Sequence, residues 1–261
     1  MAQRGGDWVC LQNCHLAVSW LAKLELIVER MQNDPDLVHA DFRIWLTSMP
    51  STKFPVPVLQ NGIKVTNEPP RGLRANLTRT FGDVSDADYE SCTKPVFKKL
   101  LFATAFFNAL ILERRKFGAV GWNIPYDWMN SDLKAATTQV KMYVEEQALV
   151  PWETLNVSVA QITYGGRVTD VWDKRTISSI LTNYFQPDLV TDAFTFTADK
   201  VYYAPPEGDL QSLRDYIRQL PTEDSPDVFG LHSNAAITFQ QQESRNLIAT
   251  VLLCSGGGGG G

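Results

Sequence analysis

The sequence predicts an α/β N-terminal part followed by a mainly α-helical region. Its first 84 residues contain a short apolar run, an amphipathic stretch and a second short apolar run, which is the order strand, helix, strand. From residue 93 onward, apolar residues recur at helical spacing in one segment after another. We therefore predict a partial parallel sheet with helices over residues 1–84, helices over residues 93–254 and a flexible glycine tail over residues 255–261.

The predicted strands of the N-terminal part are short. Trp8 to Gln12 is an apolar run that predicts the first strand, and Phe42 to Thr47, rich in β-formers, predicts the second. Between them, residues 15–32 carry apolar side chains at helical spacing. A strand–helix–strand unit places its two strands in parallel. Ile63 to Thr66 predicts a third strand, and we expect at least one edge of this sheet to be unpaired.

The most apolar helix is predicted over Val96 to Phe117. Apolar residues lie almost all round it, so it should be buried on more than one side, and Thr93 and Pro95 suit its start. The string Glu113-Arg-Arg-Lys followed by Gly118 suits its end. Further helices are predicted over Ser131–Gln147, Pro151–Thr163, Asp170–Phe185, Asp209–Leu220 and Ala235–Cys254.

Composition and charge argue against several classes of protein. With 261 residues, 44% of them hydrophobic and 20% charged, the chain has a globular composition, and its net charge of −5 argues against a broad nucleic-acid surface. The longest apolar stretch, Leu100–Leu112, is interrupted by Asn108 and is too short to span a bilayer. The N-terminus has no signal-peptide core. Cysteines at positions 10, 14, 92 and 254 match no zinc spacing, so Cys10 and Cys14 are predicted to be small buried residues in a reducing, intracellular compartment.

The chain lacks the residues that ATP hydrolysis needs. No G-x-x-x-x-G-K-[ST] string occurs in it. Gln12 and Asn13 stand at the end of the first predicted strand, where a hydrolytic module would place acidic residues for magnesium and water. His15, His39 and His232 are scattered and lack partners at metal-ligand spacing. We therefore predict no catalytic, cofactor-binding or metal-binding residues in this chain.

Two polar strings could contact a partner. The cluster Arg114-Arg115-Lys116 is predicted to be a helix end with its charges facing solvent, although it could also bind phosphate or an acidic partner. The string from Tyr164 contains Gly165, Gly166, Arg167 and Asp170. Two interpretations of this string are open. In the first it is a structured helix-to-helix turn, in which Arg167 and Asp170 could pair and Thr169 or Asp170 could cap the next helix. In the second it is an inter-module contact.

Several distinctive strings follow one another over nearly the whole chain, from about residue 8 to about residue 253. Tyr164-Gly-Gly-Arg-Val-Thr-Asp is the strongest of them. The others include Trp8-Val-Cys-Leu-Gln-Asn-Cys-His-Leu-Ala, Asp41-Phe-Arg-Ile-Trp-Leu-Thr-Ser-Met-Pro, Asn67-Glu-Pro-Pro-Arg-Gly-Leu-Arg-Ala-Asn-Leu, Glu113-Arg-Arg-Lys-Phe-Gly and Phe229-Gly-Leu-His-Ser-Asn-Ala. In this order, they resemble the motor region of axonemal dynein heavy chains, in particular the sixth and last AAA+ module of the ring.

The resemblance implies a structural, non-hydrolysing ring module of a minus-end-directed microtubule motor that drives ciliary or flagellar movement. Residues 1–84 would be part of the AAA+ large subdomain, and residues 93–254 the small subdomain and the start of the C-terminal region. Its partners would be the other AAA+ modules, and indirectly intermediate and light chains. ATP, magnesium and the microtubule-binding stalk would belong to other parts of a heavy chain, and neither nucleic acid nor membrane is expected as a partner. The implied location is the cytoskeleton of the cytoplasm and the ciliary axoneme.

The sequence departs from the family pattern at three positions. Val171 stands where a second Asp is expected, Lys174 where Arg is usual, and Asn108 where His is frequent. The chain is also expected to be a fragment, a short isoform or a partial gene model, because it lacks the linker and the hydrolytic modules. Two alternatives remain at this point: an independent α/β enzyme, for which no catalytic constellation is found, and a stand-alone interaction module whose helical half presents a partner surface.

Overall fold

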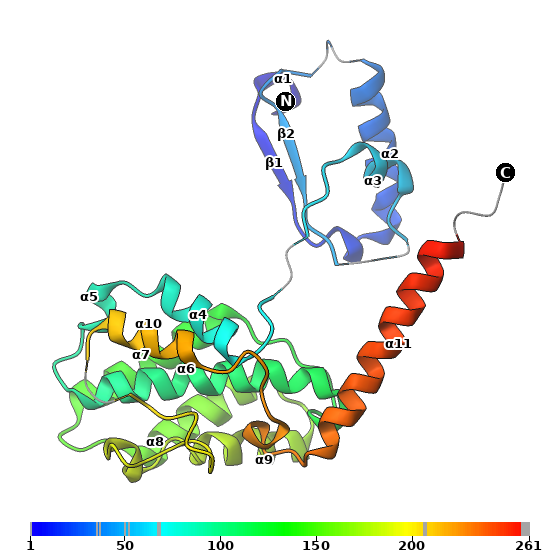
Figure 1. The fold of residues 1–261 in the computed structure, drawn as a ribbon. Coiled ribbons are helices and arrows are strands. Elements are labelled where there is room, and N and C mark those ends of the chain that lie inside the picture. Colours follow the sequence, from blue (N-terminus) through cyan, green and yellow to red (C-terminus); the bar gives the residue numbers. More distant parts are fainter. Residues whose placement is uncertain are drawn as a thin grey trace. The chain divides into compact units, whose positions relative to one another are not determined.

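A computed structural model describes residues 2–256, except residues 35, 37, 50, 52, 67, 68, 206 and 207. The chain divides into two compact units, Met1–Glu68 and Pro69–Gly261, and each is described by itself. The predicted class is confirmed, because a small parallel sheet is followed by helices (Figure 1). Of the predicted glycine tail, residues 257–261 lie outside the described residues, whereas Ser255 and Gly256 belong to the last helix.

The N-terminal unit contains two parallel strands with a long helix between them in the chain. Trp8 pairs with Arg43 and Leu11 with Leu46, which confirms the predicted strand–helix–strand order. Among the described residues the sheet has these two strands only, so each strand has one unpaired edge. The elements are α1 (Ala2–Gly5), β1 (Trp8–Leu11), α2 (Val18–Asn33), β2 (Arg43–Leu46) and α3 (Val56–Asn61).

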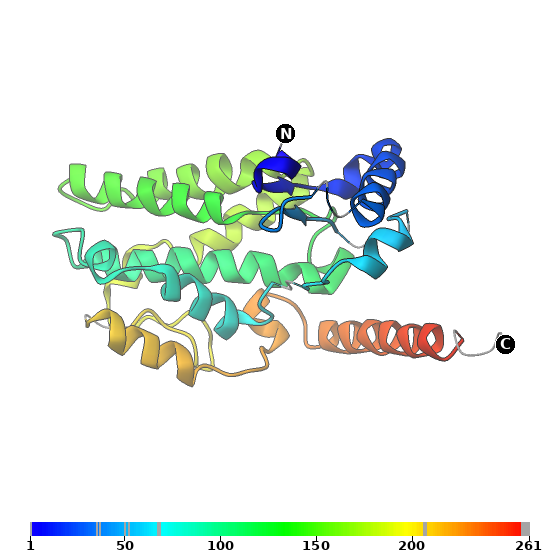
Figure 2. The ribbon, with the colours of Figure 1, turned by 90° about the horizontal axis from the view of Figure 1, so that it is seen from above.

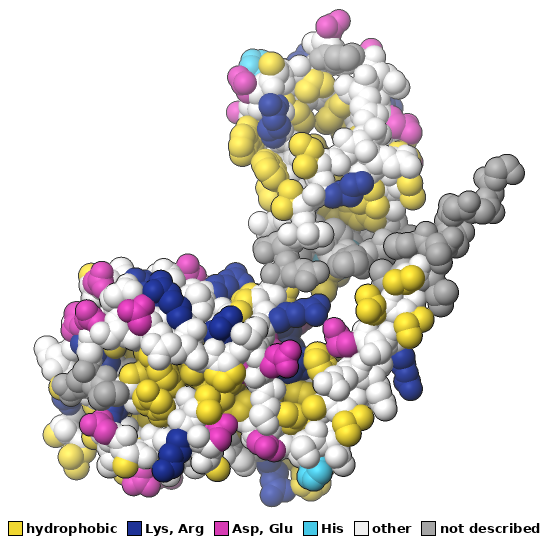
Figure 3. Space-filling view, viewed as in Figure 1, with side chains coloured by type: hydrophobic (Ala, Val, Ile, Leu, Met, Phe, Trp, Pro, Cys, Tyr) yellow, Lys and Arg dark blue, Asp and Glu magenta, His cyan; other side chains and the backbone are white. Residues whose placement is uncertain are grey.

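One face of this sheet is covered and the other is exposed. Leu11 and Leu46 pack with Leu21 and Leu24 of α2, because alternate strand residues point to the same face. The opposite face carries Trp8 and Trp45, 68% and 50% exposed, whose ring centroids lie 5.7 Å apart. Cys10 shares this face, so the prediction that it is buried is wrong, whereas Cys14 is buried. Hydrophobic side chains are accordingly visible at the surface of the unit in Figure 3.

The predicted third strand is absent from the described part of the unit. Residues 63–66 have no regular structure, and Ile63 and Val65 are exposed. Their composition favours a strand, but a strand forms only where its N–H and C=O groups pair with a neighbour. Among the described residues this segment pairs with neither β1 nor β2, so the prediction was wrong.

The helical unit is built around α6 (Val96–Arg114). Figures 1 and 2 show α7 on one side of α6 and α4 on the other, with α10 packed against α4. The helices of this unit are α4 (Leu73–Asp83), α5 (Asp86–Tyr89), α6, α7 (Asn130–Glu146), α8 (Trp152–Asn156), α9 (Val171–Thr182), α10 (Leu210–Gln219) and α11 (Asn234–Gly256). The π-helical turns Val157–Tyr164 continue α8, and 3₁₀ turns cover Arg115–Val120, Gly165–Arg167, Pro187–Val190 and Pro226–Phe229.

The core of the helical unit is rich in aromatic rings that surround α6. Phe106 is fully buried, and its ring lies 5.3 Å from that of Tyr184, 4.8 Å from that of Phe196 and 5.5 Å from that of Tyr202. Burial along α6 is nearly continuous, which confirms the prediction of a helix buried on more than one side. Such a helix can be stable only when other elements enclose it.

The boundary between the units lies earlier than residue 84. Leu73, Leu77 and Phe81 of α4 are fully buried in the same core as α6. The apolar stripe of α4 is therefore satisfied by the helical unit, and residues 69–84 belong with it. Among the described residues, no helix is both long and apolar enough to cross a membrane.

Candidate functional site

The turn that contains Gly165 and Gly166 links the π-helical segment to α9. A Cβ atom on Gly165 would lie 2.6 Å from the carbonyl oxygen of Ala160, which is too close for any side chain. A Cβ atom on Gly166 would meet nothing within 4 Å. The turn therefore requires glycine at one of these positions, and the reason is close backbone approach and not an unusual φ angle.

Arg167 pairs with Asp132, not with Asp170 as the sequence analysis allowed. Its Nε donates to Asp132 Oδ2 at 3.0 Å and its Nη2 donates to Oδ1 at 3.1 Å. The same carboxylate accepts from the backbone N–H of Met129 at 2.8 Å, in the first turn of α7. A two-point guanidinium–carboxylate pair fixes orientation as well as distance. It therefore holds the turn against the N-terminus of α7.

Asp170 caps α9, as one of the predicted alternatives had it. Its Oδ1 accepts from the backbone N–H groups of Trp172 at 2.9 Å and Asp173 at 3.0 Å, and from Asn123 Nδ2 at 3.1 Å. These hydrogen bonds lower the pKa of Asp170. The hydrogen bond from the Asp173 backbone has the largest effect, and the one from the Asn123 side chain has the next largest. The carboxylate therefore stays ionised where the helix N-terminus favours negative charge.

The sequence analysis missed Asp173, the second carboxylate of this turn. It is buried and accepts from the backbone N–H of Asn123 at 3.1 Å, the backbone N–H of Ile124 at 3.3 Å and the hydroxyl of Tyr126 at 2.9 Å. The Tyr126 hydroxyl in turn accepts from the backbone N–H of Asp170 at 3.2 Å. Burial is the main cause of the raised pKa of Tyr126. This network joins the segment before α7 to the start of α9.

A third connection joins the turn to α6. The hydroxyl of Tyr164 donates to Asn108 Oδ1 at 3.1 Å, and Trp128 Nε1 donates to the carbonyl of Tyr164 at 3.2 Å. Tyr164 is fully buried, edge-on to Phe107, and burial raises the pKa of its hydroxyl. Asn108, a departure from the family pattern, thus has a defined role as the acceptor of this hydroxyl. The turn is held by α6, α7 and α9 together.

Large apolar side chains flank this rigid turn at the surface. Ile162, Val171 and Trp172 are 64%, 69% and 65% exposed. Val171 and Trp172 follow the Asp170 cap directly, and Ile162 precedes the glycines by three residues. Exposed apolar groups on a firmly held backbone are typical of interaction surfaces.

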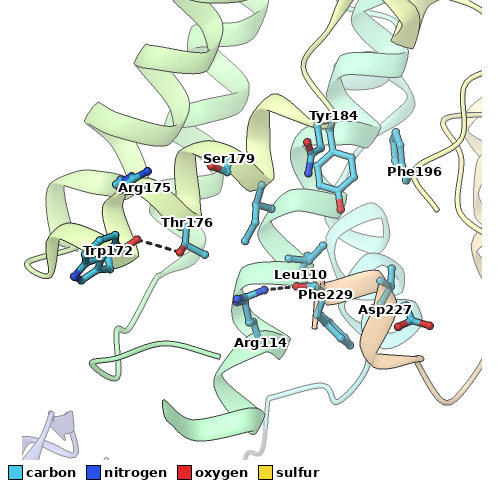
Figure 4. Close-up of a pocket in the computed structure, with 14 residues that line it drawn as sticks. Leu110, Arg114, Trp172, Arg175, Thr176, Ser179, Tyr184, Phe196, Asp227 and Phe229 are labelled. Carbon is cyan, nitrogen blue, oxygen red and sulfur yellow. Dashed lines mark hydrogen bonds between the residues drawn. The ribbon is translucent and has the colours of Figure 1, made fainter. Parts of the chain in front are cut away.

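A cavity of about 570 Å³ lies beside α9 (Figure 4). It opens to the surface and is lined mainly by residues of α6, of α9 and of the 3₁₀ turn Pro226–Phe229. Arg114 of α6 lines it, and this side chain is buried, with Nε donating to the carbonyl of Gly121 at 2.8 Å and Nη1 donating to that of Phe229. Burial lowers the pKa of Arg114, an effect that the charges of Asp173 and Tyr184 oppose.

The prediction that the basic cluster faces solvent is therefore wrong for Arg114. The C-terminal end of α6 is enclosed by a 3₁₀ turn and by the segment of Phe229, which the local sequence does not reveal. Arg115 and Lys116 are half-buried. Arg115 pairs with Asp127 at 2.6 Å, and Lys116 lies 3.5 Å from a carboxylate oxygen of Glu113.

Each of the three histidines accepts a hydrogen bond from a backbone N–H, which lies two positions away for His39 and His232 and 34 positions away for His15. The Nδ1 atoms of His15, His39 and His232 accept from the backbone N–H groups of Met49, Asp41 and Asn234 at 3.2 Å each. Within the described ranges, no three His, Cys, Asp or Glu side chains are arranged to hold a metal ion.

Comparison with known protein families identifies this chain's relatives. Residues 97–235, which contain both the turn and the cavity, match the family described as dynein heavy chain AAA lid domain. The chain belongs to the dynein heavy chain family. Residues 1–66 match a second dynein description, the dynein heavy chain region D6 P-loop domain. The two dynein matches lie in the two structural units, one in each.

Individual dynein heavy chains agree with this assignment and confirm the predicted resemblance to the axonemal branch. The chain is 46% identical over 248 residues to dynein axonemal heavy chain 1 of Homo sapiens, which covers 94% of the chain and 6% of that relative. It is 47% identical over 250 residues to dynein axonemal heavy chain 3 of Mus musculus, with 94% and 6% covered. It is 44% identical over 247 residues to the dynein-1-beta heavy chain, flagellar inner arm I1 complex, of Chlamydomonas reinhardtii, with 94% and 5% covered. The chain thus spans about 6% of the length of the dyneins it matches.

Proposed function

We propose that this chain is a structural, non-hydrolysing module of the AAA+ ring of an axonemal dynein heavy chain. The ring would belong to a minus-end-directed microtubule motor of cilia and flagella. The observation that carries this proposal is the carboxyl end of the parallel sheet, which is where open α/β sheets bind their ligands. That end is closed by hydrogen bonds between the two strands' continuations and carries neutral side chains.

The closure involves the residues that follow each strand. The backbone N–H of Asn13 donates to Thr47 Oγ1 at 3.0 Å, that of Cys14 donates to the Thr47 carbonyl at 2.9 Å, and that of Thr47 donates to the Leu11 carbonyl at 3.0 Å. The adjacent side chains include Gln12 and Asn13, which carry no charge. Magnesium and an attacking water need carboxylates in this place, so the arrangement supports a module without ATP turnover.

The proposed partners follow from the dynein family. The other AAA+ modules of the ring would contact this chain directly, and intermediate and light chains would be bound to it only indirectly. ATP, magnesium and microtubules would be bound by other parts of a heavy chain. The names of the relatives, axonemal heavy chains and a flagellar inner-arm subunit, support a location in the axoneme of a cilium or flagellum.

The turn of Gly165, Gly166, Arg167 and Asp170 is proposed as an inter-module contact. Its backbone is held from three helices, so a force on the turn would be passed to α6, α7 and α9 together. The exposed apolar side chains beside it would provide the contact area. Arg167 and Asp170 would act as positioning residues.

The exposed apolar surface also favours a second candidate, a stand-alone interaction module without catalysis. The two candidates differ in the partners they require. A ring module should associate with dynein heavy chains and be found with axonemes. A stand-alone module should associate with other proteins and be found independently of dynein.

Co-purification from ciliated cells tests the proposal. A tagged form of the chain is expected to be recovered with dynein heavy chains in the axonemal fraction. The double variant Ile162→Ser, Val171→Ser should weaken that recovery, whereas Leu149→Ser, which alters a still more exposed leucine in the loop between α7 and α8, should not. Recovery without any dynein subunit would overturn the ring proposal, and equal recovery of the double variant would overturn the role of the turn.

A further inference from the structure

The cavity beside α9 contains a buried cation without an anionic partner. Among the described residues, no carboxylate lies within ion-pair distance of Arg114, and its two hydrogen bonds go to backbone carbonyls. Its Nη2 has no hydrogen-bonding partner in the described part of the chain. No fully enclosed side-chain nitrogen or oxygen among the described residues lacks a partner, so this unpartnered Nη2 is open to solvent in the cavity and is available to an anion.

A second polar group points into the same cavity. The ring of Tyr184 is largely buried, and its hydroxyl has no hydrogen-bonding partner among the residues described, so the hydroxyl is open to solvent in the cavity. Figure 4 shows the hydroxyl directed toward the part of the cavity lined by Leu110 and Phe229, on the side of Arg114. The two groups are near enough that the charge of Arg114 opposes the rise in pKa that burial causes at Tyr184. A hydroxyl and a guanidinium thus line the same cavity, and both can donate hydrogen bonds.

The rim adds a further cation and an aromatic face. Arg175 lies over the ring of Trp172, 5.2 Å from its centroid, and forms no ion pair with a described residue. Thr176, whose hydroxyl donates to the Trp172 carbonyl at 3.0 Å, lies one residue further along α9. Asp227 is the acidic residue among those described that line the cavity, and Figure 4 shows its carboxylate beyond Phe229, away from Arg114. The anion-accepting part of the cavity is therefore free of that carboxylate.

We propose that this cavity binds an acidic side chain of a partner protein segment, with a neighbouring aromatic or aliphatic side chain packed on the exposed ring of Trp172. Arg114 and the Tyr184 hydroxyl would donate to the carboxylate, and Arg175 would strengthen the field at the rim. The volume of about 570 Å³ is in the range of small-ligand sites and accommodates two side chains.

Two observations favour a carboxylate on a protein over other anions. Asp173 acts on Arg114 by its charge, so a doubly charged phosphate at Arg114 would be repelled more than a carboxylate. Trp172, 65% exposed at the mouth, is of the residue type that most often anchors protein interfaces. The inference rests on the cavity alone, so its failure would leave the proposal about ATP untouched.

Binding of defined probes to the 261-residue chain tests the proposal. The probes are the end-blocked peptide acetyl-Gly-Phe-Glu-Gly-amide, its Gln counterpart, 3-phenylpropionate and inorganic phosphate, each followed by ligand-observed NMR. We expect the Glu peptide to bind at least tenfold more tightly than the Gln peptide, as a charge-assisted pair requires. Equal binding of the two peptides, or binding of 3-phenylpropionate without binding of the Glu peptide, would overturn the proposal. Tighter binding of phosphate than of the Glu peptide would overturn the choice of a carboxylate.

Three variants locate the binding. Tyr184→Phe removes only a hydroxyl that has no partner among the described residues, so the fold should persist while affinity for the Glu peptide falls about tenfold. Arg175→Gln should lower the affinity for the same peptide by about threefold, as expected for a partly solvated charge. Lys174→Gln, on the neighbouring position of α9 but outside the cavity lining, is the matched control and should leave affinity unchanged. Unchanged affinity in Tyr184→Phe, or an equal loss in Lys174→Gln, would place binding elsewhere and contradict the proposal.

Discussion

Arg167 forms a two-point ion pair with Asp132, which lies 35 positions earlier in the chain. The pair joins the turn before α9 to the first turn of α7, and Asp132 is only 11% exposed while Arg167 is 40% exposed. Since α7 packs on α6, the most buried helix, the pair gives the turn an indirect connection to the centre of the helical unit.

Arg167→Gln should loosen the turn without unfolding the unit. The arginine is partly exposed, so solvent screening limits the loss to about 1 kcal/mol, or roughly 2–4 °C in melting temperature for a chain of this size. Thermal unfolding and amide exchange over residues 164–170 measure the two effects. Arg218→Gln, which removes an exposed pair within α10, is the control and should change the melting temperature by less. An equal effect of the two substitutions would show that the Arg167 pair is an ordinary surface pair.

Gly165→Ala and Gly166→Ala should change the free energy of unfolding by different amounts, and the two changes could be opposite in sign. The Cβ of the first would lie 2.6 Å from the Ala160 carbonyl oxygen, and forcing the backbone apart should cost about 1–3 kcal/mol. The Cβ of the second meets open space, so its effect should stay within about 1 kcal/mol and could be stabilising through the unfolded chain. Chemical denaturation of both variants measures the difference. Similar stabilities would contradict the close approach at Gly165.

Phe106→Asp should unfold or aggregate the helical unit. Phe106 is fully buried among aromatic rings, and an unpaired carboxylate in that place costs several kcal/mol, roughly the whole stability margin of a domain. Phe106→Leu, which keeps an apolar side chain, should remain soluble with a lowered melting temperature. A soluble Asp variant that melts at the temperature of the parent chain would show that α6 is not enclosed on this face.

Amides of the N-terminal sheet should exchange faster than those of α6. A two-stranded sheet is marginal in water, and both strands have an unpaired edge among the described residues. One face also carries the exposed Trp8 and Trp45. Hydrogen exchange on the soluble chain compares residues 8–11 and 43–46 with residues 100–111. Equally slow exchange in the two regions would mean that the N-terminal unit is as stable as the helical unit.

Local patterns in the sequence were sufficient for the elements whose environment they encode. The all-round apolar character of residues 96–114 predicted the buried α6, because a helix without a polar face has to be enclosed. Asp170 was a correct candidate for a helix cap, because capping depends on the two or three residues that follow it. The two parallel strands were predicted for the same reason, since their apolar runs and the helix between them are contiguous.

Features that depend on distant residues could not be predicted. Asp173 accepts hydrogen bonds from residues 47–50 positions away, and nothing adjacent to it in sequence marks it as buried. The local sequence predicts that Arg114 is a solvent-facing cation at a helix end. In the structure its guanidinium is buried and donates to the carbonyl of Phe229, 115 positions later. Residues 63–66 have strand composition but pair with neither β1 nor β2. In each case the deciding partner is set by the tertiary fold and not by local spacing.

Titration of the chain with magnesium-ATP tests the central claim, that this dynein module does not turn over nucleotide, most directly. Isothermal titration calorimetry reports binding, and a phosphate-release assay in the presence and absence of magnesium reports hydrolysis. Because Gln12 and Asn13 supply no charge at the closed end of the sheet, we predict no measurable binding and no phosphate release above a control without protein. Micromolar binding, or magnesium-dependent phosphate release above that control, would contradict the account.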